Sequence, residues 1–435
     1  MLSKEAIAPA VSKLQPHYFY RRAHTHIFEA ITSLYKKGEP VDLVTVSSEL
    51  SKAGCLDETG GRAYLAEVVD TVPTTRNIEK YSNIVAEKAM LRQLIDMGAH
   101  IVEEGFDETQ EASDVMELAQ RKVMEISREQ VTEEFIKIDK VLKTVFDDIQ
   151  SVYTNEERIL GVPTGFQDLD AITSGFQKSD LIILAARPAM GKTTLALNFA
   201  VHAAVVKKIP VAIFSLEMPC EQLAMRLLSS ESKLDSKRLR TANLQDHEYK
   251  NLIDGMGRLS ESPLYIDDSP SLSPMELRAK TRRLQMEADI GLILIDYMQL
   301  MKSSKKKVES RYHEVSEIVR EVKAFAKEAK IPIIALSQLS RSIEQRSIED
   351  RRPKLSDLRE SGEIEQTADL VCFIHREDYA EESYATDDVS NNQKVSSADL
   401  VIAKHRNGPT GTIKLMFKKD ISKFMSAAPV HVVPD

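Results

Sequence analysis

The sequence predicts an α-helical N-terminal domain followed by an α/β domain with a mostly parallel sheet. In the first part of the chain, apolar residues recur every three or four positions, as in helices that bury one face. From residue 181 onward, short apolar runs alternate with segments of helical period. Strands that alternate with helices indicate a parallel sheet covered on both faces.

The N-terminal part is predicted to be a set of helices. The apolar spacing predicts helices over residues 25–36 and 77–104, and a further amphipathic helix within 133–153. The charged residues 154–158 follow that helix and suit a hinge. We therefore expect a helical domain over 1–127, a linker with its amphipathic helix over 128–158, and the α/β domain over 159–435.

The strands of the second domain are predicted from seven apolar runs. They are residues 181–186, 211–216, 264–267, 292–296, 331–337, 370–374 and 400–403. Ligands of open parallel sheets bind beyond the carboxyl ends of the strands. Functional side chains are therefore expected where these runs end.

Composition excludes several classes of protein. The 435 residues are 42% hydrophobic and 29% charged, as in ordinary globular proteins. The net charge of −9 excludes the simplest basic DNA-binding protein, but residues 101–134 hold eleven acids and three bases, so the rest is near neutral. A nucleic-acid partner thus remains open. The three cysteines lie too far apart for a disulfide framework or a metal motif, and no apolar run is long enough to span a membrane. We expect a soluble, cytoplasmic protein.

The strongest single signal is the segment 186–194, which follows an apolar run and opens a helix. Its spacing is that of a phosphate-binding loop, with Ala186 at the position of the first glycine. Successive backbone N–H groups and the helix N-terminus would hold phosphate oxygens, Lys192 would neutralise them, and Thr193 would ligate Mg²⁺. The residues expected to contact the nucleotide here are Ala189, Met190, Gly191, Lys192, Thr193 and Thr194.

Three further polar side chains stand at strand ends. Asp296 ends one run and could hold Mg²⁺ opposite Thr193, Glu217 follows another and could act as a general base, and Gln338 follows a third. Each has an ordinary structural reading, since buried strands often end in Asp and Glu217 could be a helix-start acid. Their convergence on one sheet edge favours nucleotide hydrolysis.

Several segments together resemble the bacterial DnaB-type replicative helicases. They are residues 161–170 with 173–176, 185–194, 214–218, 295–300, 336–341, 355–366 and 403–409. The resemblance covers nearly the whole chain, and the family's phosphate loop commonly also begins with alanine. It implies a RecA-like α/β domain that uses ATP and Mg²⁺. It also implies a homohexameric ring that moves 5′→3′ on single-stranded DNA at the replication fork, with a primase and a helicase loader as partners.

The resemblance also assigns roles at the nucleotide site. Lys192 and Thr193 would bind phosphates and Mg²⁺, Glu217 would be the catalytic base, Asp296 the Walker-B acid, Arg226 a nucleotide contact and Gln338 a link to the DNA loops. Lys404 and Arg406 resemble fingers that act on ATP held by the neighbouring subunit. A cation supplied in trans speeds phosphoryl transfer by roughly 10³–10⁵ in comparable systems and makes hydrolysis depend on assembly. From the residues alone, Lys404 and Arg406 would be a solvated strand end.

Two segments are expected to contact DNA. By resemblance, Arg359, Glu360 and Gly362 match the residues that touch the DNA backbone. The basic stretch 302–312, with Lys305, Lys306, Lys307 and Arg311, occupies the position of the other DNA loop. Apart from Tyr312 neither segment offers an aromatic platform, so we expect the protein to follow the DNA backbone without stacking on bases.

Two departures from the family and two alternatives remain. The chain begins about one helix later than the family's chains, which puts assembly of the N-terminal collar, and hence primase recruitment, in question. The polar segment 381–397 has no assigned function. The alternatives are a RecA-type recombinase, which would form filaments, and a truncated ring component that acts as an ATP-binding scaffold.

Overall fold

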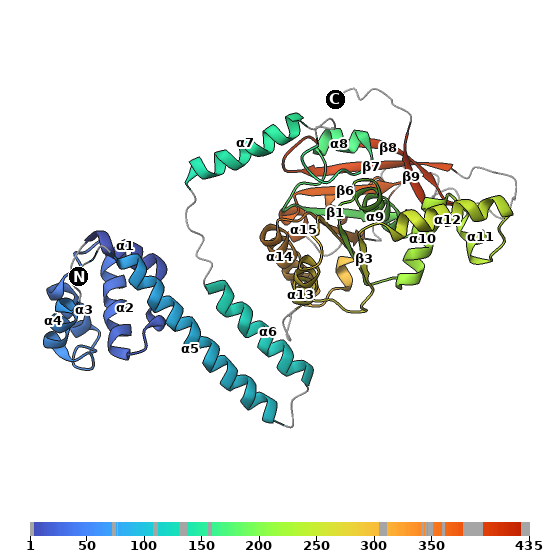
Figure 1. Cartoon of the computed structure of the whole chain (residues 1–435). Helices are drawn as coiled ribbons and strands as arrows, with labels where there is room; N and C mark the ends of the chain where they lie inside the picture. Colours follow the sequence, from blue (N-terminus) through green and yellow to red (C-terminus); the bar gives the residue numbers. More distant parts are fainter. Residues whose placement is uncertain are drawn as a thin grey trace. The chain divides into compact units, whose positions relative to one another are not determined.

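The computed structural model describes residues 4–71, 75, 77–107, 112–129, 137–154, 159–303, 311–340, 343, 346, 351–358, 362–376 and 395–427. Contacts divide the chain into two compact units, Met1–Val141 and Leu142–Asp435 (Figure 1). The division falls inside α7 (Ile138–Thr154), so this helix spans both units. Residues 155–158, the expected hinge, lie outside the described residues.

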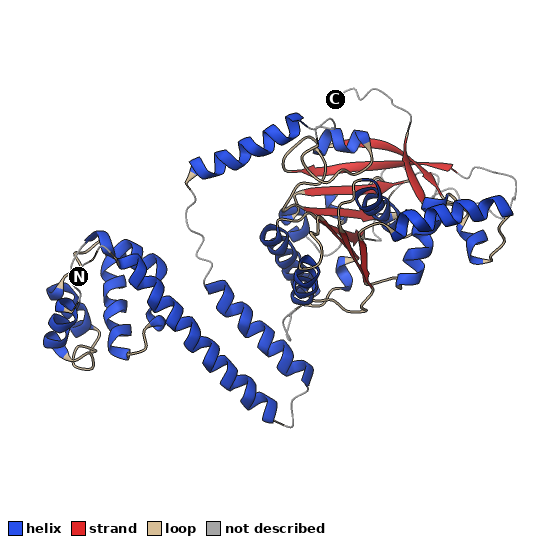
Figure 2. Ribbon diagram, in the orientation of Figure 1, coloured by secondary structure: helices blue, strands red, loops and turns tan. Residues whose placement is uncertain are grey.

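The described part of the first unit is helical (Figure 2). The helices predicted over 25–36 and 77–104 are confirmed as α2 and α5. In order, the elements are α1 (Lys4–Lys13), η1 (Pro16–Tyr18), α2 (Arg22–Lys37), α3 (Leu43–Lys52), α4 (Gly61–Asp70), α5 (Ile78–Phe106) and α6 (Ala112–Glu129). α3 begins where the Asp42 carboxylate accepts the backbone N–H groups of Val44 and Thr45. Leu34, Val46 and other apolar side chains of α2 to α4 form the core of this unit.

The second unit is built on a sheet whose described strands run in the order β3-β2-β4-β5-β1-β6-β7-β8-β9. Strands β1 to β6 pair in parallel, and β7 to β9 continue the sheet in antiparallel pairs. Their bounds are β1 (Leu181–Ala186), β2 (Val211–Ser215), β3 (Leu264–Asp267), β4 (Leu292–Asp296), β5 (Ile333–Gln338), β6 (Leu370–His375), β7 (Val395–His405), β8 (Gly411–Lys418) and β9 (Lys423–Ser426). The predicted α/β class with a mostly parallel sheet is confirmed.

Helices cover this sheet and connect its strands. They are α8 (Gln167–Thr173), α9 (Lys192–Val201), η2 (His202–Val206), α10 (Cys220–Ser232), α11 (Ser236–Arg240), α12 (Asp246–Ser260), α13 (Pro274–Gln285), η3 (Met298–Leu300), α14 (Arg311–Ala329), η6 (Leu355–Asp357) and α15 (Gly362–Thr367). None of the helices in the described residues is both long and apolar enough to cross a membrane.

Two apolar layers lie on opposite faces of the sheet. Because side chains alternate along a strand, Ile182 and Leu184 of β1 join one layer with Phe199 of α9. The residues between them, such as Ile183, join the other layer with Phe325 of α14. All six residues of β1 are buried. This explains why the parallel strands are continuous apolar runs in the sequence.

The strand predictions fail at the antiparallel edge. The run 400–403 marks only part of β7, and β8 and β9 were not predicted. In β8, buried and exposed residues alternate, so no continuous apolar run appears. The run 331–337 also begins early, since Pro332 lacks the N–H group that a ladder bond needs and β5 starts at Ile333.

The end of the sheet opposite the phosphate loop carries a pair of partly buried acids. Burial, and then the charge of Asp369, raise the pKa of Asp180 to about 6. The Asp369 carboxylate has hydrogen-bond partners of its own. Its Oδ2 accepts from the backbone N–H of Leu181 at 2.8 Å and from Lys323 Nζ at 2.5 Å. The charges of Lys323 and Arg406 offset this rise only in part, so the ionised form of Asp180 opposes folding.

We expect Asp180→Asn to raise the free energy of unfolding of the second unit by about 2 kcal/mol at pH 8. A carboxyl whose pKa is raised on folding stabilises the protein only while it is protonated, so the wild type loses stability as the pH rises from about 4 through 6. The gain should therefore shrink as the pH falls toward 4. Urea unfolding of both proteins at several pH values tests this, and an equal gain at every pH would contradict it.

Candidate functional site

A cavity of about 980 Å³ lies at the carboxyl ends of the parallel strands. Register brings these ends together, since Ala186 pairs with Gln338 and Ser215 pairs with Asp296. The phosphate-loop residues line the cavity together with side chains from the neighbouring strand ends. The lining residues used below are Ala189, Gly191, Lys192, Thr193, Thr194, Glu217, Arg226, Tyr297 and Gln338.

The backbone of the loop takes conformations that expose its N–H groups. Ala189 and Gly191 have φ angles of 64° and 94°, in the left-handed region. A Cβ atom at Gly191 would lie 3.0 Å from two ring carbons of Phe424, so glycine is also required by packing. α9 begins at the next residue and directs its free N–H groups at the cavity. The Met190 side chain is buried, so only its backbone is available to a ligand.

Lys192, Thr193 and Asp296 meet at the floor of the cavity. Asp296 is buried, and its Oδ2 accepts a hydrogen bond from Thr193 Oγ1 at 2.7 Å. Its Oδ1 accepts no hydrogen bond from any described residue and lies 3.9 Å from Lys192 Nζ. A buried carboxylate oxygen without a donor is costly unless a ligand fills the place. Thr193 and Asp296 therefore fit Mg²⁺ or its water, which prefers hydroxyl and carboxylate oxygens.

The Lys192 ammonium is a partly dehydrated cation. Burial lowers the pKa of Lys192, and the charges of Asp296 and Glu217 oppose that shift. Its Nζ also lies 4.6 Å from the centre of the Tyr297 ring, which offers a negative face. An anion that enters the cavity would therefore interact strongly with the Lys192 ammonium.

Glu217 stands in a turn that is tied to both neighbouring strands. Ser215 Oγ donates to the backbone carbonyl of Met218 at 2.7 Å, and the backbone N–H of Leu216 donates to the carbonyl of Asp296 at 2.7 Å. These bonds hold the exposed Glu217 carboxylate at the cavity wall. The structure thus brings Glu217 and Gln338 to the phosphate loop, as expected from the strand ends.

The cavity holds further basic side chains that the sequence analysis did not assign to the site. Beside Arg226, the lining residues include Arg187, Arg240, Arg376 and Lys419, while its acids are Glu217 and Glu221. Two contacts position the Arg376 side chain. Its NH2 group donates to Ser396 Oγ at 2.8 Å, and its guanidinium lies 4.6 Å from the Phe417 ring centre. The excess of positive charge suits a polyanion such as a nucleoside triphosphate.

Lys404 and Arg406 do not line this cavity. Lys404 Nζ donates to the carbonyls of Glu365 at 2.5 Å and Gln366 at 3.1 Å. Arg406 donates to the Gln366 carbonyl at 2.6 Å and to Asp369 at 3.2 Å. Burial and then Arg406 lower the pKa of Lys404. Both cations are thus fixed at the end of α15, away from the phosphate loop of their own chain.

Most of the expected DNA contacts lie outside the described residues, namely Lys305, Lys306, Lys307, Arg359 and Glu360. So does most of the segment 381–397. The described ends of the two DNA segments adjoin. Arg311 begins α14, where it pairs with Glu314 and donates to the Gln299 carbonyl. Gly362 begins α15, and a Cβ there would lie 3.5 Å from Tyr312 Oη.

Comparisons with known proteins agree along the whole chain. The models of the DnaB-like helicase N terminal domain and C terminal domain match residues 1–87 and 161–426. Replicative DNA helicase DnaB of Geobacillus stearothermophilus is 46% identical over 425 residues, 98% of this chain and 91% of the relative. Replicative DNA helicase DnaC of Bacillus subtilis (strain 168) is 45% identical over the same shares.

Two solved structures are also similar. The first is described as a DnaB-like replicative helicase and its interactions with primase. It aligns with a TM-score of 0.73 and 31% identity over 98% of this chain and all of that one. The second, described as the ATPase domain of G40P, aligns with a TM-score of 0.61 and 35% identity over 68% of this chain and all of that one.

Proposed function

The chain belongs to the DnaB-like replicative DNA helicases, and we propose that it works as a homohexameric ring that moves 5′→3′ along one strand of a replication fork. We propose that the protein hydrolyses ATP, which binds with Mg²⁺ in the cavity at the carboxyl ends of the strands. The observation that carries this proposal is the hydrogen bond from Thr193 to the buried Asp296, whose other carboxylate oxygen lies near Lys192.

In this proposal each residue of the cavity has one task. Mg²⁺, when bound, supplies positive charge to the phosphate oxygens. Thr193 and Asp296 hold it, and Lys192 balances charge that develops on the transferred phosphoryl group. Glu217 accepts a proton from the attacking water, and its position at the cavity wall suits a general base. Gln338 ends the strand beside the loop, where it can respond to the phosphate.

We further propose that Lys404 and Arg406 complete the site of the neighbouring subunit. Their own cavity does not include them, and the carbonyls at the end of α15 hold them in place. In a ring, Lys404 and Arg406 of each subunit would lie at the phosphate loop of the neighbouring subunit, so hydrolysis would depend on assembly.

Ring assembly has support from the linker helix. α7 exposes an apolar stripe that includes Ile138, Leu142, Phe146 and Ile149. An uncovered apolar stripe of this kind is typical of a surface that packs on another protein. We propose that it packs on the α/β domain of the next subunit and joins neighbouring motors.

The proposed DNA site comprises the stretch 302–312 and the segment that holds Arg359, Glu360 and Gly362. Their described residues Tyr312 and Gly362 adjoin where α14 and α15 begin, and Arg320, further along α14, binds Glu363 of α15 through two bonds of 2.7 and 2.8 Å. α14 and α15 would therefore move together when DNA shifts. We expect contacts to phosphates rather than to bases, which suits a motor that must pass any sequence.

We expect Arg359→Ala to weaken single-strand binding about tenfold, by a similar factor for every sequence, because a phosphate contact is lost. The slope of log K against log salt concentration should flatten by about 0.7. Fluorescence anisotropy with several oligonucleotides at graded salt measures both values. Arg283→Ala, an exposed arginine of α13, is the matched control. A loss confined to some sequences would mean that Arg359 reads bases.

Partners and location follow from the same proposal. A primase is the first partner we propose, since one similar structure is described with its primase interactions. The N-terminal helices are its docking surface in this proposal, and a loader would open the ring on DNA. We propose that the protein acts in the cytoplasm, at the replication fork.

Unwinding of a forked duplex tests the proposed function. ATP-dependent strand separation that requires a 5′ tail supports a 5′→3′ ring helicase. Requirement for a 3′ tail would contradict the polarity. Filaments in electron micrographs would support a recombinase, and nucleotide binding without DNA-stimulated turnover would support a scaffold.

A further inference from the structure

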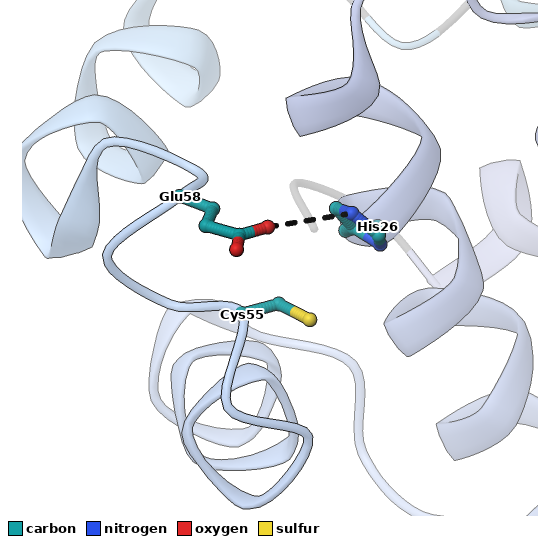
Figure 3. Close-up of side chains that lie close together, drawn as sticks. All are labelled: His26, Cys55 and Glu58. Atoms are coloured by element: carbon teal, nitrogen blue, oxygen red, sulfur yellow. Dashed lines mark ion pairs between the residues drawn. The ribbon is translucent and has the colours of Figure 1, made fainter.

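Three side chains that could bind a metal meet in the N-terminal unit, far along the chain from the motor. His26 lies on α2, and Cys55 and Glu58 lie in the turn between α3 and α4. One ligand atom from each lies within 4.8 Å of the others. Figure 3 shows the three side chains directed at one common space between the helix and the turn.

The turn that carries Cys55 and Glu58 is fixed by its own hydrogen bonds. The Cys55 N–H donates to the Leu50 carbonyl at 3.0 Å, and the Thr59 N–H donates to the Cys55 carbonyl at 3.1 Å. The buried Thr59 hydroxyl also donates to the Leu56 carbonyl at 2.7 Å. The two ligand positions, three residues apart, are therefore presented by an ordered backbone.

The His26 ring is held by a carboxylate on the side away from the turn. Its Nδ1 lies 3.2 Å from Glu29 Oε2, one turn further along α2. Its Nε2 lies 4.0 Å from Glu58 Oε2, the contact drawn in Figure 3. A carboxylate on the far nitrogen of a ligating histidine is the usual outer support of zinc sites, because it fixes the ring and its tautomer.

We propose that His26, Cys55 and Glu58 bind one Zn²⁺ ion or a similar divalent transition metal, with water as the fourth ligand. Imidazole, thiolate and carboxylate together are the donors that zinc accepts at bond lengths of about 2.0–2.3 Å. The ligand atoms, now within 4.8 Å of one another, must draw closer to reach that geometry, and Glu58 is exposed enough to move. The thiolate disfavours Mg²⁺ and Ca²⁺, so this site is distinct from the magnesium site of the motor.

The metal would join α2 to the α3–α4 turn. Cys55 already packs beside the core of the N-terminal unit, so the ion would stabilise that unit from its surface. Because the ligands come from segments about thirty residues apart, the bond closes a loop in the unfolded chain. Ligand binding to the folded state alone raises stability.

Cobalt titration of the full-length protein tests the proposal. Metal is removed with a chelator, and Co²⁺ is added without nucleotide. We expect a thiolate-to-cobalt charge-transfer band that saturates at one ion per chain and disappears when Zn²⁺ is added. Cys55→Ser should lose the band, whereas the matched variant Cys220→Ser should keep it. Glu29→Gln should weaken binding about 10- to 100-fold, since it removes only the outer support of His26.

Two other results would overturn the proposed site, and a third would overturn the role of Glu29. The absence of the band in the wild type, or its survival in Cys55→Ser, would overturn the site. Unchanged affinity in Glu29→Gln would overturn the role of the outer carboxylate. Urea unfolding of metal-free Cys55→Ser and wild-type protein serves as the check that the N-terminal unit of this variant is folded.

Discussion

Lys192→Ala protein is expected to hydrolyse ATP about 10²–10³-fold more slowly than the wild type, with and without DNA. Lys192 is the cation that lies beside the buried Asp296 carboxylate, 3.9 Å from its unbonded oxygen. Alanine leaves the developing phosphate charge without this partner. It also leaves Asp296 with less positive charge nearby, so the electrostatics of the cavity shift against an anion.

Phosphate release in a single turnover, at saturating ATP and Mg²⁺, measures this loss. Lys250→Ala is the matched control, because it removes an exposed lysine of α12 that does not line the cavity. Turnover near the wild-type rate in Lys192→Ala would mean that the loop at 186–194 is not the hydrolytic site.

For Arg406→Ala we expect hydrolysis to fall about 10³-fold or more while ATP binding stays within a factor of two or so. Arg406 lies outside the cavity of its own chain and is held by the Gln366 carbonyl and Asp369. In the proposed ring, its loss would remove charge from the neighbour's site without changing the cavity that binds nucleotide.

Fluorescent-nucleotide titration and steady-state hydrolysis separate the two effects. Arg352→Ala is the matched control, since it removes an exposed arginine that pairs with Asp399 and bonds to Thr412 on the same β7–β8 hairpin. If Arg406→Ala lost nucleotide binding, Arg406 would belong to the site of its own subunit.

An element could be predicted from the sequence where its burial produces a local pattern of apolar residues. Strands β1, β2, β4, β5 and β6 are buried on both faces, so each is a continuous apolar run that the sequence shows directly. Because parallel strands end at one edge, the sequence alone predicts that Asp296, Glu217 and Gln338 lie together. The helices α2 and α5 were predictable from their 3.6-residue period.

The rest of the site depends on pairing that local patterns do not carry. Lys419 reaches the cavity from the end of β8, a strand that alternates in burial, and Arg376 follows β6 but is held by Ser396 of β7 and Phe417 of β8. Phe424 restricts Gly191 from more than two hundred residues away. The roles of Lys404 and Arg406 came only from family resemblance, since residues alone would describe a solvated strand end.

The proposed N-terminal metal site leaves no pattern in the sequence. Cys55, Cys220 and Cys372 are far apart along the chain and form no motif. The ligand set that the fold assembles instead mixes three residue types from two separated segments. Only the packing of the α3–α4 turn against α2 brings Cys55 and Glu58 to His26.

The central claim is that one active site is built from two chains, and mixed rings test it most directly. Lys192→Ala and Arg406→Ala chains, each with a different affinity tag, are coexpressed and purified through both tags. In a head-to-tail ring, roughly a quarter of the interfaces then combine an intact phosphate loop with an intact finger. We predict that ATPase activity reappears in the mixed rings although each variant alone is inactive. Mixed rings that assemble but stay as inactive as either parent would contradict the claim.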